Sequence, residues 1–253
     1  MMFRTLIVLG LSLASPAAAQ DAENADAALI MELLSATDDA SRGAQSTAVM
    51  TMSVKTARYE RSMKMKAWSS GTERSLIRIL EPPKDAGVST LKVEDNLWNY
   101  LPKVDRTMKV PAGMMSSAWM GSHLSNDDLV RENRLSEDFT YVVQQRPDNK
   151  GQGNWVIACT PTEDAAVVWG KVVVEVEPRK VPVKVEYYDE KGVLVRTMSY
   201  SDVQEIDGRL SPMTMTLLPH DKEGEYTKIS FDELDYSTVL PVEMFSLQSL
   251  KKL

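Results

Sequence analysis

The chain has 253 residues, a formal net charge of −7 and a single cysteine. Its acidic balance argues against a nucleic-acid-binding protein and against general attraction to anionic lipid surfaces, because both need a basic surface. One cysteine cannot form an internal disulfide, and Cys159 lies in an apolar, strand-like stretch, so we expect it to be a buried apolar residue. The length suits one sizeable β domain, which we place at residues 20–253.

Residues 1–19 have the pattern of a secretory signal peptide. Arg4 precedes an apolar run from Thr5 to Ala14, small residues follow, and cleavage is expected before Gln20. The run of about ten residues is too short to cross a bilayer, although a short membrane anchor is the alternative. A bacterial lipoprotein would carry a cysteine directly after the cleavage point, so Gln20 predicts a soluble mature protein.

The segment from Asp21 to Gly43 is predicted to be an amphipathic helix. Leu29, Leu33 and Leu34 recur at helical spacing, and acidic residues at the start suit the helix dipole. Gly43 can end the helix. After it the pattern changes to alternation of apolar and polar residues, which is typical of antiparallel strands with one buried face.

Three alternating segments lie between Ser46 and Leu80, followed by shorter ones around the turn at 94–96. The segment Pro111–Asn133 breaks the alternation and predicts one or two short helices, and the C-terminal residues 241–253 predict another. Strands resume after it, separated by turns rich in Gly and Asp. They are expected at 138–146, 154–161, 171–178, 182–190, 194–206, 210–218 and 226–234. About a dozen strands in a near-continuous meander indicate one strongly bent antiparallel sheet, whose concave face is either filled by side chains or covered by helices.

Methionines and aromatic residues are the candidates for an apolar binding surface. Met is flexible and polarizable, so a wall rich in the chain's 15 methionines would adapt to acyl chains of different lengths; ordinary core filling is the alternative. Trp98 and Tyr100 are two apart and share a strand face. The candidate cavity and lid residues are Met63, Met65, Trp68, Trp98, Tyr100, Met114, Met115, Trp119 and Met120.

The stretch from Met120 to Val130, MGSHLSNDDLV, combines groups found in hydrolases, but its spacing favours a helix start. Ser125 is a good N-cap, and Asp128, three residues on, takes the place of the acid in a capping box. Leu124 and Leu129 form a plausible hydrophobic staple. The sequence carries no metal-binding motif, phosphate loop or nucleophile elbow, so we expect no catalytic residue, metal or cofactor.

Two motifs give the chain a resemblance to a known family. LWNYLPK (Leu97 to Lys103) and MGSHLSNDDL (Met120 to Leu129), with the N-terminal helix and the strand-rich second half, resemble the LolA-like outer-membrane lipoprotein-sorting proteins, in a branch associated with lipid exporters. The resemblance implies a mainly β (α+β) fold, in which a strongly curved antiparallel sheet forms an unclosed β-barrel with a helical lid. It also implies a periplasmic monomer in the Gram-negative envelope that carries acyl chains.

The match to this branch is incomplete. Gly121 and Ser122 follow its second motif, but His123 and Leu124 stand where the branch usually has an acid and an aromatic residue. The resemblance also implies an early-strand arginine that fastens the lid, and Arg58 and Arg61 are the candidates.

Three functions remain open at this point. The first is a carrier that binds the acyl chains of lipoproteins or other lipids for transfer to the outer membrane. The second is a periplasmic adaptor or lipid sensor that partners an inner-membrane exporter of the resistance-nodulation-division type. The third is a secreted hydrolase that uses Ser125, His123 or Asp128. The carrier is favoured, since an acyl chain cannot cross water unaided at about 0.8 kcal/mol for each exposed CH₂.

Overall fold

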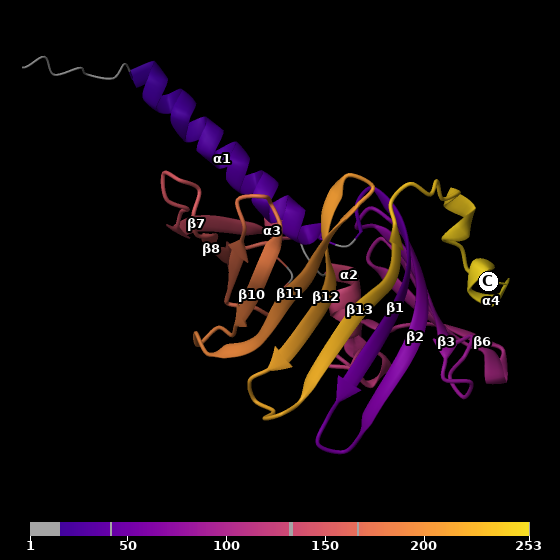
Figure 1. Ribbon diagram of the computed structural model, residues 1–253. Coiled ribbons are helices and arrows are strands. Elements are labelled where there is room, and N and C mark those ends of the chain that lie inside the picture. The colour runs from indigo at the N-terminus through magenta and orange to yellow at the C-terminus, as the bar shows by residue number, and fades with distance from the viewer. Residues whose placement is uncertain (1–15, 41, 132–133, 166, 253) are drawn as a thin grey trace, which may run out of the picture.

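The computed structural model describes residues 16–40, 42–131, 134–165 and 167–252 (Figure 1). One sheet dominates the molecule and holds 13 strands, all antiparallel to their neighbours. The first group of strands is β1 (Gln45–Lys55), β2 (Glu60–Ser70), β3 (Arg74–Glu81), β4 (Ser89–Val93), β5 (Asn96–Leu101) and β6 (Arg106–Lys109). The second group is β7 (Phe139–Gln145), β8 (Trp155–Pro161), β9 (Lys171–Val176), β10 (Pro182–Tyr188), β11 (Leu194–Ile206), β12 (Arg209–Pro219) and β13 (Tyr226–Asp235).

Each group is a simple meander, and the pairing of β1 with β13 joins the two groups into one sheet. The sheet curves strongly and does not close, so β6 and β7 are its two edges (Figure 1). These edge strands follow each other in the sequence, and the chain between them links the two sides of the opening. The predicted fold, an unclosed β-barrel of antiparallel strands, is confirmed, and the predicted strands of the second half occur in the predicted order.

The helices are few and short apart from the first. They are α1 (Pro16–Asp38), α2 (Asn126–Arg131), α3 (Leu135–Asp138) and α4 (Ser249–Lys252), with 3₁₀ turns at Pro102–Val104, Ala112–Met114, Trp119–Gly121 and Val242–Met244. We call residues 110–131 and 134–138, which include α2 and α3, the cover segment. Among the described residues, no helix is long and apolar enough to cross a membrane.

Helix α1 differs at both ends from the predicted helix. It begins at Pro16 and so runs through the expected cleavage site before Gln20, whereas residues 1–15 of the predicted signal peptide lie outside the described residues. It ends at Asp38, before Gly43, because the amides of Ala40 and Gly43 bond in tight turns to the carbonyls of Thr37 and Asp39. Gly43 itself has a positive φ of 58° and leads into β1.

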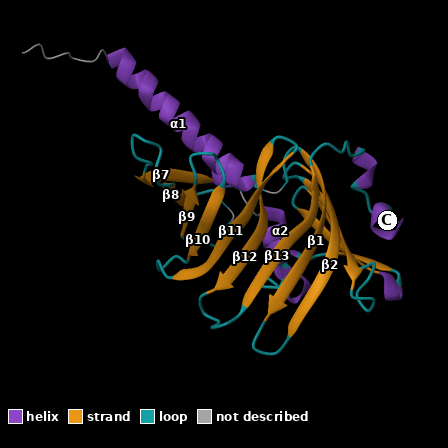
Figure 2. Ribbon diagram, in the orientation of Figure 1, coloured by secondary structure: helices purple, strands orange, loops and turns teal. Residues whose placement is uncertain are grey.

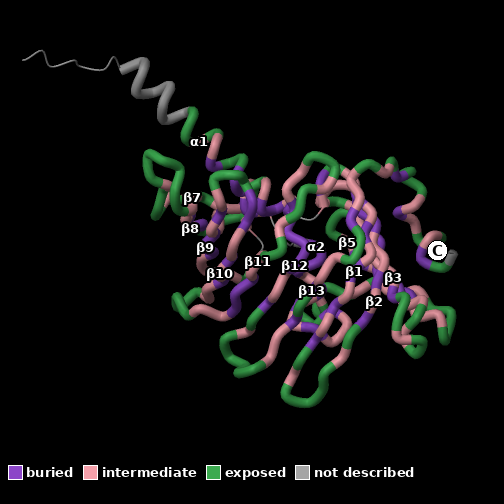
Figure 3. The backbone as a smooth tube through the Cα atoms, viewed as in Figure 1, coloured by how far each residue is buried: buried purple, intermediate pink, exposed green. Residues whose placement is uncertain are grey.

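Burial separates the molecule into an inner and an outer core (Figure 3). The inner core lies on the concave face of the sheet, where Ile30, Leu33 and Leu34 of α1 pack with strand residues and with the cover segment. The outer core lies on the opposite face of β2 to β5, beneath the C-terminal segment, residues 236–252. In Figure 2, α2 is seen behind β12 and β13, on the inner side of the curve.

Candidate functional site

Four methionines form the centre of the concave face. Met50 is paired across the strands with Met65, and Met52 with Met63. Met52, Met63 and Met65 are fully buried, and Met50 nearly so. They lie on one face because side chains alternate along β1 and β2, and the curvature of the sheet points this face at the cover segment. Met63 and Met65 therefore lie where a cavity beneath a lid would place them.

The cover segment contributes its own apolar side chains to the same core. Trp119 is 2% exposed, and its indole Nε1 donates a 3.1 Å hydrogen bond to Oγ1 of Thr90 on β4. Met115 and Met120 are partly buried and pack against the inner core. Met114 differs from these three, because 53% of its surface is exposed. The prediction that all four face the interior is therefore wrong for Met114.

The aromatic residues on the strands belong to the other face of the sheet. Trp68, Trp98 and Tyr100 pack in the outer core with Leu76 and with residues of the C-terminal segment. Trp68 is paired across the strands with Thr47, out of phase with the inward-facing residues of β2. The prediction that these residues line a cavity beneath the lid is wrong for Trp98 and Tyr100, whereas Trp68 also borders the 110 Å³ cavity described below. Trp98 and Tyr100 do share a face, but the face points away from the cover segment.

Helix α2 begins with the predicted capping box. The Ser125 hydroxyl accepts a hydrogen bond from the backbone N–H of Asp128 at 3.1 Å, and Asp128 Oδ2 accepts one from the N–H of Ser125 at 2.7 Å. Before it, the Ser122 hydroxyl donates to the carbonyl of Trp119 at 2.7 Å. Gly121 has φ +69°, and a Cβ there would lie 2.9 Å from Oη of Tyr59, so both its backbone and its surroundings require glycine.

Asp128 also fastens α2 to the sheet. Its two carboxylate oxygens accept hydrogen bonds of 2.8 and 2.6 Å from the guanidinium of Arg196 on β11. Both side chains are about 10% exposed. Burial alone would raise the pKa of Asp128, but the hydrogen bonds and charge of Arg196 outweigh it and hold that pKa below its ordinary value. The guanidinium lies 4.5 Å from the ring centre of Trp169 and 4.4 Å from that of Tyr187.

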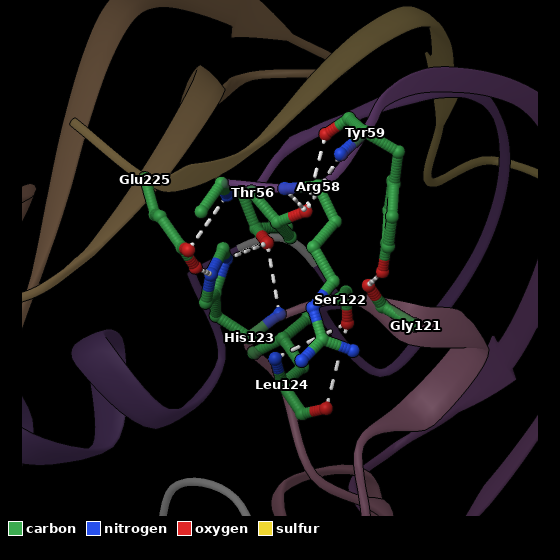
Figure 4. A network of polar contacts seen from close by, with 10 residues as sticks. Thr56, Arg58, Tyr59, Gly121, Ser122, His123, Leu124 and Glu225 are labelled. Carbon is green, nitrogen blue, oxygen red and sulfur yellow. Dashed lines mark hydrogen bonds and ion pairs between the residues drawn. The ribbon is translucent and has the colours of Figure 1, made fainter. Parts of the chain in front are cut away.

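His123 forms a second fastening, shown in Figure 4. Its backbone N–H donates to Oγ1 of Thr227 at 3.0 Å, its ring Nδ1 lies 2.9 Å from the same oxygen, and its Nε2 lies 2.8 Å from a carboxylate oxygen of Glu225. The other oxygen of Glu225 accepts from the backbone N–H of Ala57 at 2.8 Å. Tyr59 donates from its hydroxyl to the Gly121 carbonyl at 2.5 Å. These contacts join the cover segment to two neighbouring hairpins, the one between β1 and β2 and the one between β12 and β13.

Arg58 and Arg61, which the resemblance suggested as residues that fasten the lid, do not form the ion pair with helix α2. Arg61 lies beside the cover segment, with Nη1 3.8 Å from the position of a Cβ at Gly121, and forms a 3.6 Å ion pair with Asp85. Arg58 is exposed and takes part in the Thr56 turn through its backbone N–H. The guanidinium that pairs with an acid of α2 belongs to Arg196, which the sequence analysis did not single out.

Asp38 fixes the far end of the cover segment. Its carboxylate accepts hydrogen bonds from the backbone N–H groups of Leu135 and Ser136, both at 3.1 Å, and from the Ser136 hydroxyl at 2.9 Å. Burial raises the pKa of Asp38 to about 6, although these hydrogen bonds act in the opposite direction. The end of α1 and the start of α3 are therefore held together by one buried carboxyl group.

Two cavities adjoin the cover segment. One has a volume of about 110 Å³ and lies beneath it, lined by Ala48, Met50, Ala67, Trp119, Leu124 and Met215 among others. The other has about 550 Å³ and lies between the cover segment and strands β9 to β11, where Arg196, Trp169 and Tyr187 form part of its wall. Small-molecule sites usually measure about 300–1,000 Å³, so the inner cavity is too small for a lipid while the cover segment is in place.

The residues considered for hydrolysis are not arranged as a triad. Ser125 and Asp128 bond to each other in the helix cap, whereas the ring nitrogens of His123 contact Thr227 and Glu225. Cys159 is fully buried, as predicted, and burial raises the pKa of its thiol to about 12. Within the part of the chain that the structure describes, no three His, Cys, Asp or Glu residues form a group that could hold a metal ion.

Comparisons with known proteins agree with this architecture. A protein-family model described as that of an uncharacterized protein matches residues 71–252. A DUF1329 family protein from Desulfovibrio piger has a TM-score of 0.77 and 22% identity, over 89% of this chain and 98% of that one. No curated protein matches the sequence.

Two further solved structures carry names that describe the fold. A domain described as outer-membrane lipoprotein-sorting, from Vibrio parahaemolyticus, has a TM-score of 0.73 and 24% identity, over 87% of this chain and 97% of that one. A LolA superfamily protein from Nitrosomonas europaea has a TM-score of 0.69 and 21% identity, over 86% of this chain and 97% of that one. At these identities the likeness concerns the fold.

Proposed function

From the premise that this chain belongs to an uncharacterized, DUF1329-like protein family with the LolA fold, we propose that it is a non-enzymatic carrier of acyl chains. The acyl chain of a lipid or lipoprotein would lie between the methionine pairs of the concave face and the cover segment. The observation that carries the proposal is the position of this segment. It connects the two open edges of the sheet and covers an apolar surface to which it is held by separate polar contacts.

The contacts of the cover segment suit a part that opens. Arg196, Thr227 and Thr90 hold it to strands on both sides of the barrel. A net hydrogen bond contributes only about 0.5–1.5 kcal/mol, because water replaces the partner when the contact breaks. A lipid that buries many CH₂ groups at about 0.8 kcal/mol each can offset several such contacts. The structure then corresponds to the closed state, and lipid binding enlarges the inner cavity by displacing the cover segment.

The methionines beneath the segment suit a variable ligand. Met52, Met63 and Met65 have unbranched side chains with several rotatable bonds, so they can repack around chains of different length. The candidate ligand-contacting residues on this basis are Met63, Met65, Met115, Trp119 and Met120. Branched or aromatic side chains at the same positions would define one shape, whereas a carrier of mixed lipids needs a surface that adapts.

The names of the similar structures suggest where such a carrier works. Outer-membrane lipoprotein sorting takes place across the periplasm, so we propose removal of residues 1–19 as a signal peptide, and residues 20–253 as a single periplasmic lipid-binding domain. Loading would come from an inner-membrane lipid exporter, and delivery would go to an acceptor at the outer membrane.

Lipid uptake by the purified protein tests the proposal. The protein should retain lipids that mass spectrometry detects after extraction, and it should bind a fluorescent fatty-acid analogue. The variant Ala67→Trp, which fills the inner cavity, should weaken binding at least tenfold. Ser62→Trp is the matched control, because Ser62 lies on the same strand but faces outward. Absence of both retained lipid and probe binding in the unaltered protein would refute the carrier.

A further inference from the structure

Arg196 occupies an unusual place in the inner wall. It alternates along β11 with Met198 and Tyr200, which pack with the inner core, so a permanent positive charge stands in an apolar row. Its guanidinium lies near the rings of Trp169 and Tyr187 and borders the 550 Å³ cavity. Phe139, Met115 and Val172 supply apolar lining beside it. The cavity thus combines a buried cation with room for the start of an acyl chain.

The acid that pairs with this cation belongs to the cover segment. Each terminal nitrogen of Arg196 donates a hydrogen bond to a different carboxylate oxygen of Asp128, the two-point arrangement by which a guanidinium also holds a ligand carboxylate or phosphate. When α2 moves away from the sheet, Asp128 moves with it. A buried charge whose partner is removed is strongly unfavourable, so opening is favoured when another anion takes the place of Asp128.

The other charged groups at this cavity are compatible with such an exchange. Asp127 and Arg134 belong to the cover segment and leave with it, and His123 is held by Glu225 and Thr227. Arg196 is the cation on the strands that line this cavity, and strands remain in place when the cover segment opens. The charge presented to an entering ligand by this wall is therefore positive.

We propose that Arg196 is the headgroup site of an anionic amphiphile, whose carboxylate or phosphate replaces Asp128 as the acyl chain enters beneath the cover segment. This inference rests on the proposed carrier function and narrows its substrate class. A fatty acid or a phospholipid carries the required anion next to its chains. The acylated cysteine of a lipoprotein has thioether, ester and amide groups at that position, so it does not make the exchange.

Binding of matched amphiphiles to the purified protein tests the inference. Dodecyl phosphate, dodecanoate and dodecanol would be titrated below their micellar concentrations, with tryptophan fluorescence as the readout, and inorganic phosphate would be titrated alone. The two anions should bind at least tenfold more tightly than the alcohol, and inorganic phosphate should not bind measurably. Arg196→Met should remove the difference between anion and alcohol, and Arg196→Lys should retain part of it. Lys180→Met, at an exposed cation on the β9–β10 turn, should leave the difference unchanged.

Each outcome decides a separate point. Equal binding of anions and alcohol by the unaltered protein would overturn the headgroup site and leave the carrier function standing. Binding of none of the three amphiphiles would overturn both. Inorganic phosphate that binds as tightly as dodecyl phosphate would show a free-anion site instead. If Arg196→Met does not fold, Arg196→Lys decides the point: a reduced preference for the phosphate over the alcohol supports the headgroup site, and a preference unchanged from that of the unaltered protein overturns it.

Discussion

The curved sheet is covered on both faces, and the two covers are built differently. On the inner face, the cover segment lies over methionines and is held by a buried ion pair, by His123 and by Asp38. On the outer face, the C-terminal segment lies over rigid aromatic side chains, among them Trp68 and Tyr100, and adds Phe245 and Leu250 to the same buried cluster. One cover meets an adaptable surface through polar fastenings, and the other completes an aromatic core.

We infer from this difference that the outer face serves mainly stability, whereas the inner face also serves ligand binding. Aromatic cores gain stability from large buried areas and fixed packing, so the outer cover should contribute mainly to folding. Flexible side chains and polar contacts that water can replace are suited to a cover that opens and closes. We therefore expect substitutions on the outer face to change stability alone, and substitutions on the inner face to change stability and ligand binding together.

Phe245→Ala should give the largest loss of stability. Phe245 is buried in the outer core and is not part of the lining of the 110 Å³ cavity. Removing a buried phenylalanine costs about 3–5 kcal/mol, because the neighbouring side chains close the resulting space only in part. Chemical denaturation would measure this loss, and titration with a fluorescent fatty-acid analogue should give an unchanged affinity for the folded variant. A large change in affinity would contradict the separation of the two faces.

Met65→Ala is the inner counterpart and should cost about 2–5 kcal/mol. It removes a fully buried side chain that is paired across the strands with Met50, which lines the 110 Å³ cavity, and thereby enlarges this cavity. The affinity for a probe with a bulky chain should rise several-fold relative to a linear one. The comparison between the two faces fails if Met65→Ala and Phe245→Ala leave the relative affinities of the two probes equally unaffected.

Asp38→Asn should change how stability depends on pH. The pKa of Asp38 is about 6 in the folded protein, above its ordinary value of 3.8, so the folded state binds the proton more tightly. The raised pKa therefore adds to the free energy of unfolding. This contribution is present in full below pH 3.8 and is lost as the pH rises through about 6. At roughly 1.4 kcal/mol for each pKa unit, this amounts to about 3 kcal/mol.

The unaltered protein should therefore gain about 2 kcal/mol relative to Asp38→Asn between pH 7 and pH 4, and the remainder below pH 4. Burial also raises the pKa of the neighbouring Asp39, but that carboxyl is present in both proteins. Denaturation at several pH values would check the difference, and a difference that stays constant over this range would contradict the assignment of the shift to Asp38.

Tyr59→Phe should have the smallest effect. It removes the hydroxyl that donates to the Gly121 carbonyl at the margin of the cover segment, and the expected loss is about 1 kcal/mol. Because this contact holds the cover segment closed, ligand association should become faster. Stopped-flow fluorescence would measure the rate, with Tyr226→Phe as a control at a second tyrosine near the same end of the barrel, where Tyr226 pairs with Lys55.

Local patterns in the sequence were sufficient to predict the strands, the helices and the helix cap at Ser125, since turn residues, alternation and a capping acid act over a few residues. They were insufficient to predict which face of the sheet each side chain would occupy. Alternation showed that Trp98 and Tyr100 share a face, but only the curvature of the whole sheet decides which face is concave. The pair of Asp128 and Arg196 joins residues 68 positions apart. The sequence offers one indication of this ion pair: Arg196 stands two positions before Met198, on the strand face that is otherwise apolar.

The central claim is that ligands enter by displacing the cover segment from the concave face. Oγ1 of Thr227 lies within 3.0 Å of both the backbone nitrogen and the ring Nδ1 of His123, so cysteines at 123 and 227 would face each other within reach of a disulfide. The native Cys159 is buried, and burial raises the pKa of its thiol to about 12, which disfavours the thiolate needed for disulfide exchange. The most direct test is therefore lipid-probe binding by a His123→Cys, Thr227→Cys protein before and after reduction. The account predicts no binding when the disulfide locks the segment and restored binding when it is reduced; equal binding in both states would contradict it.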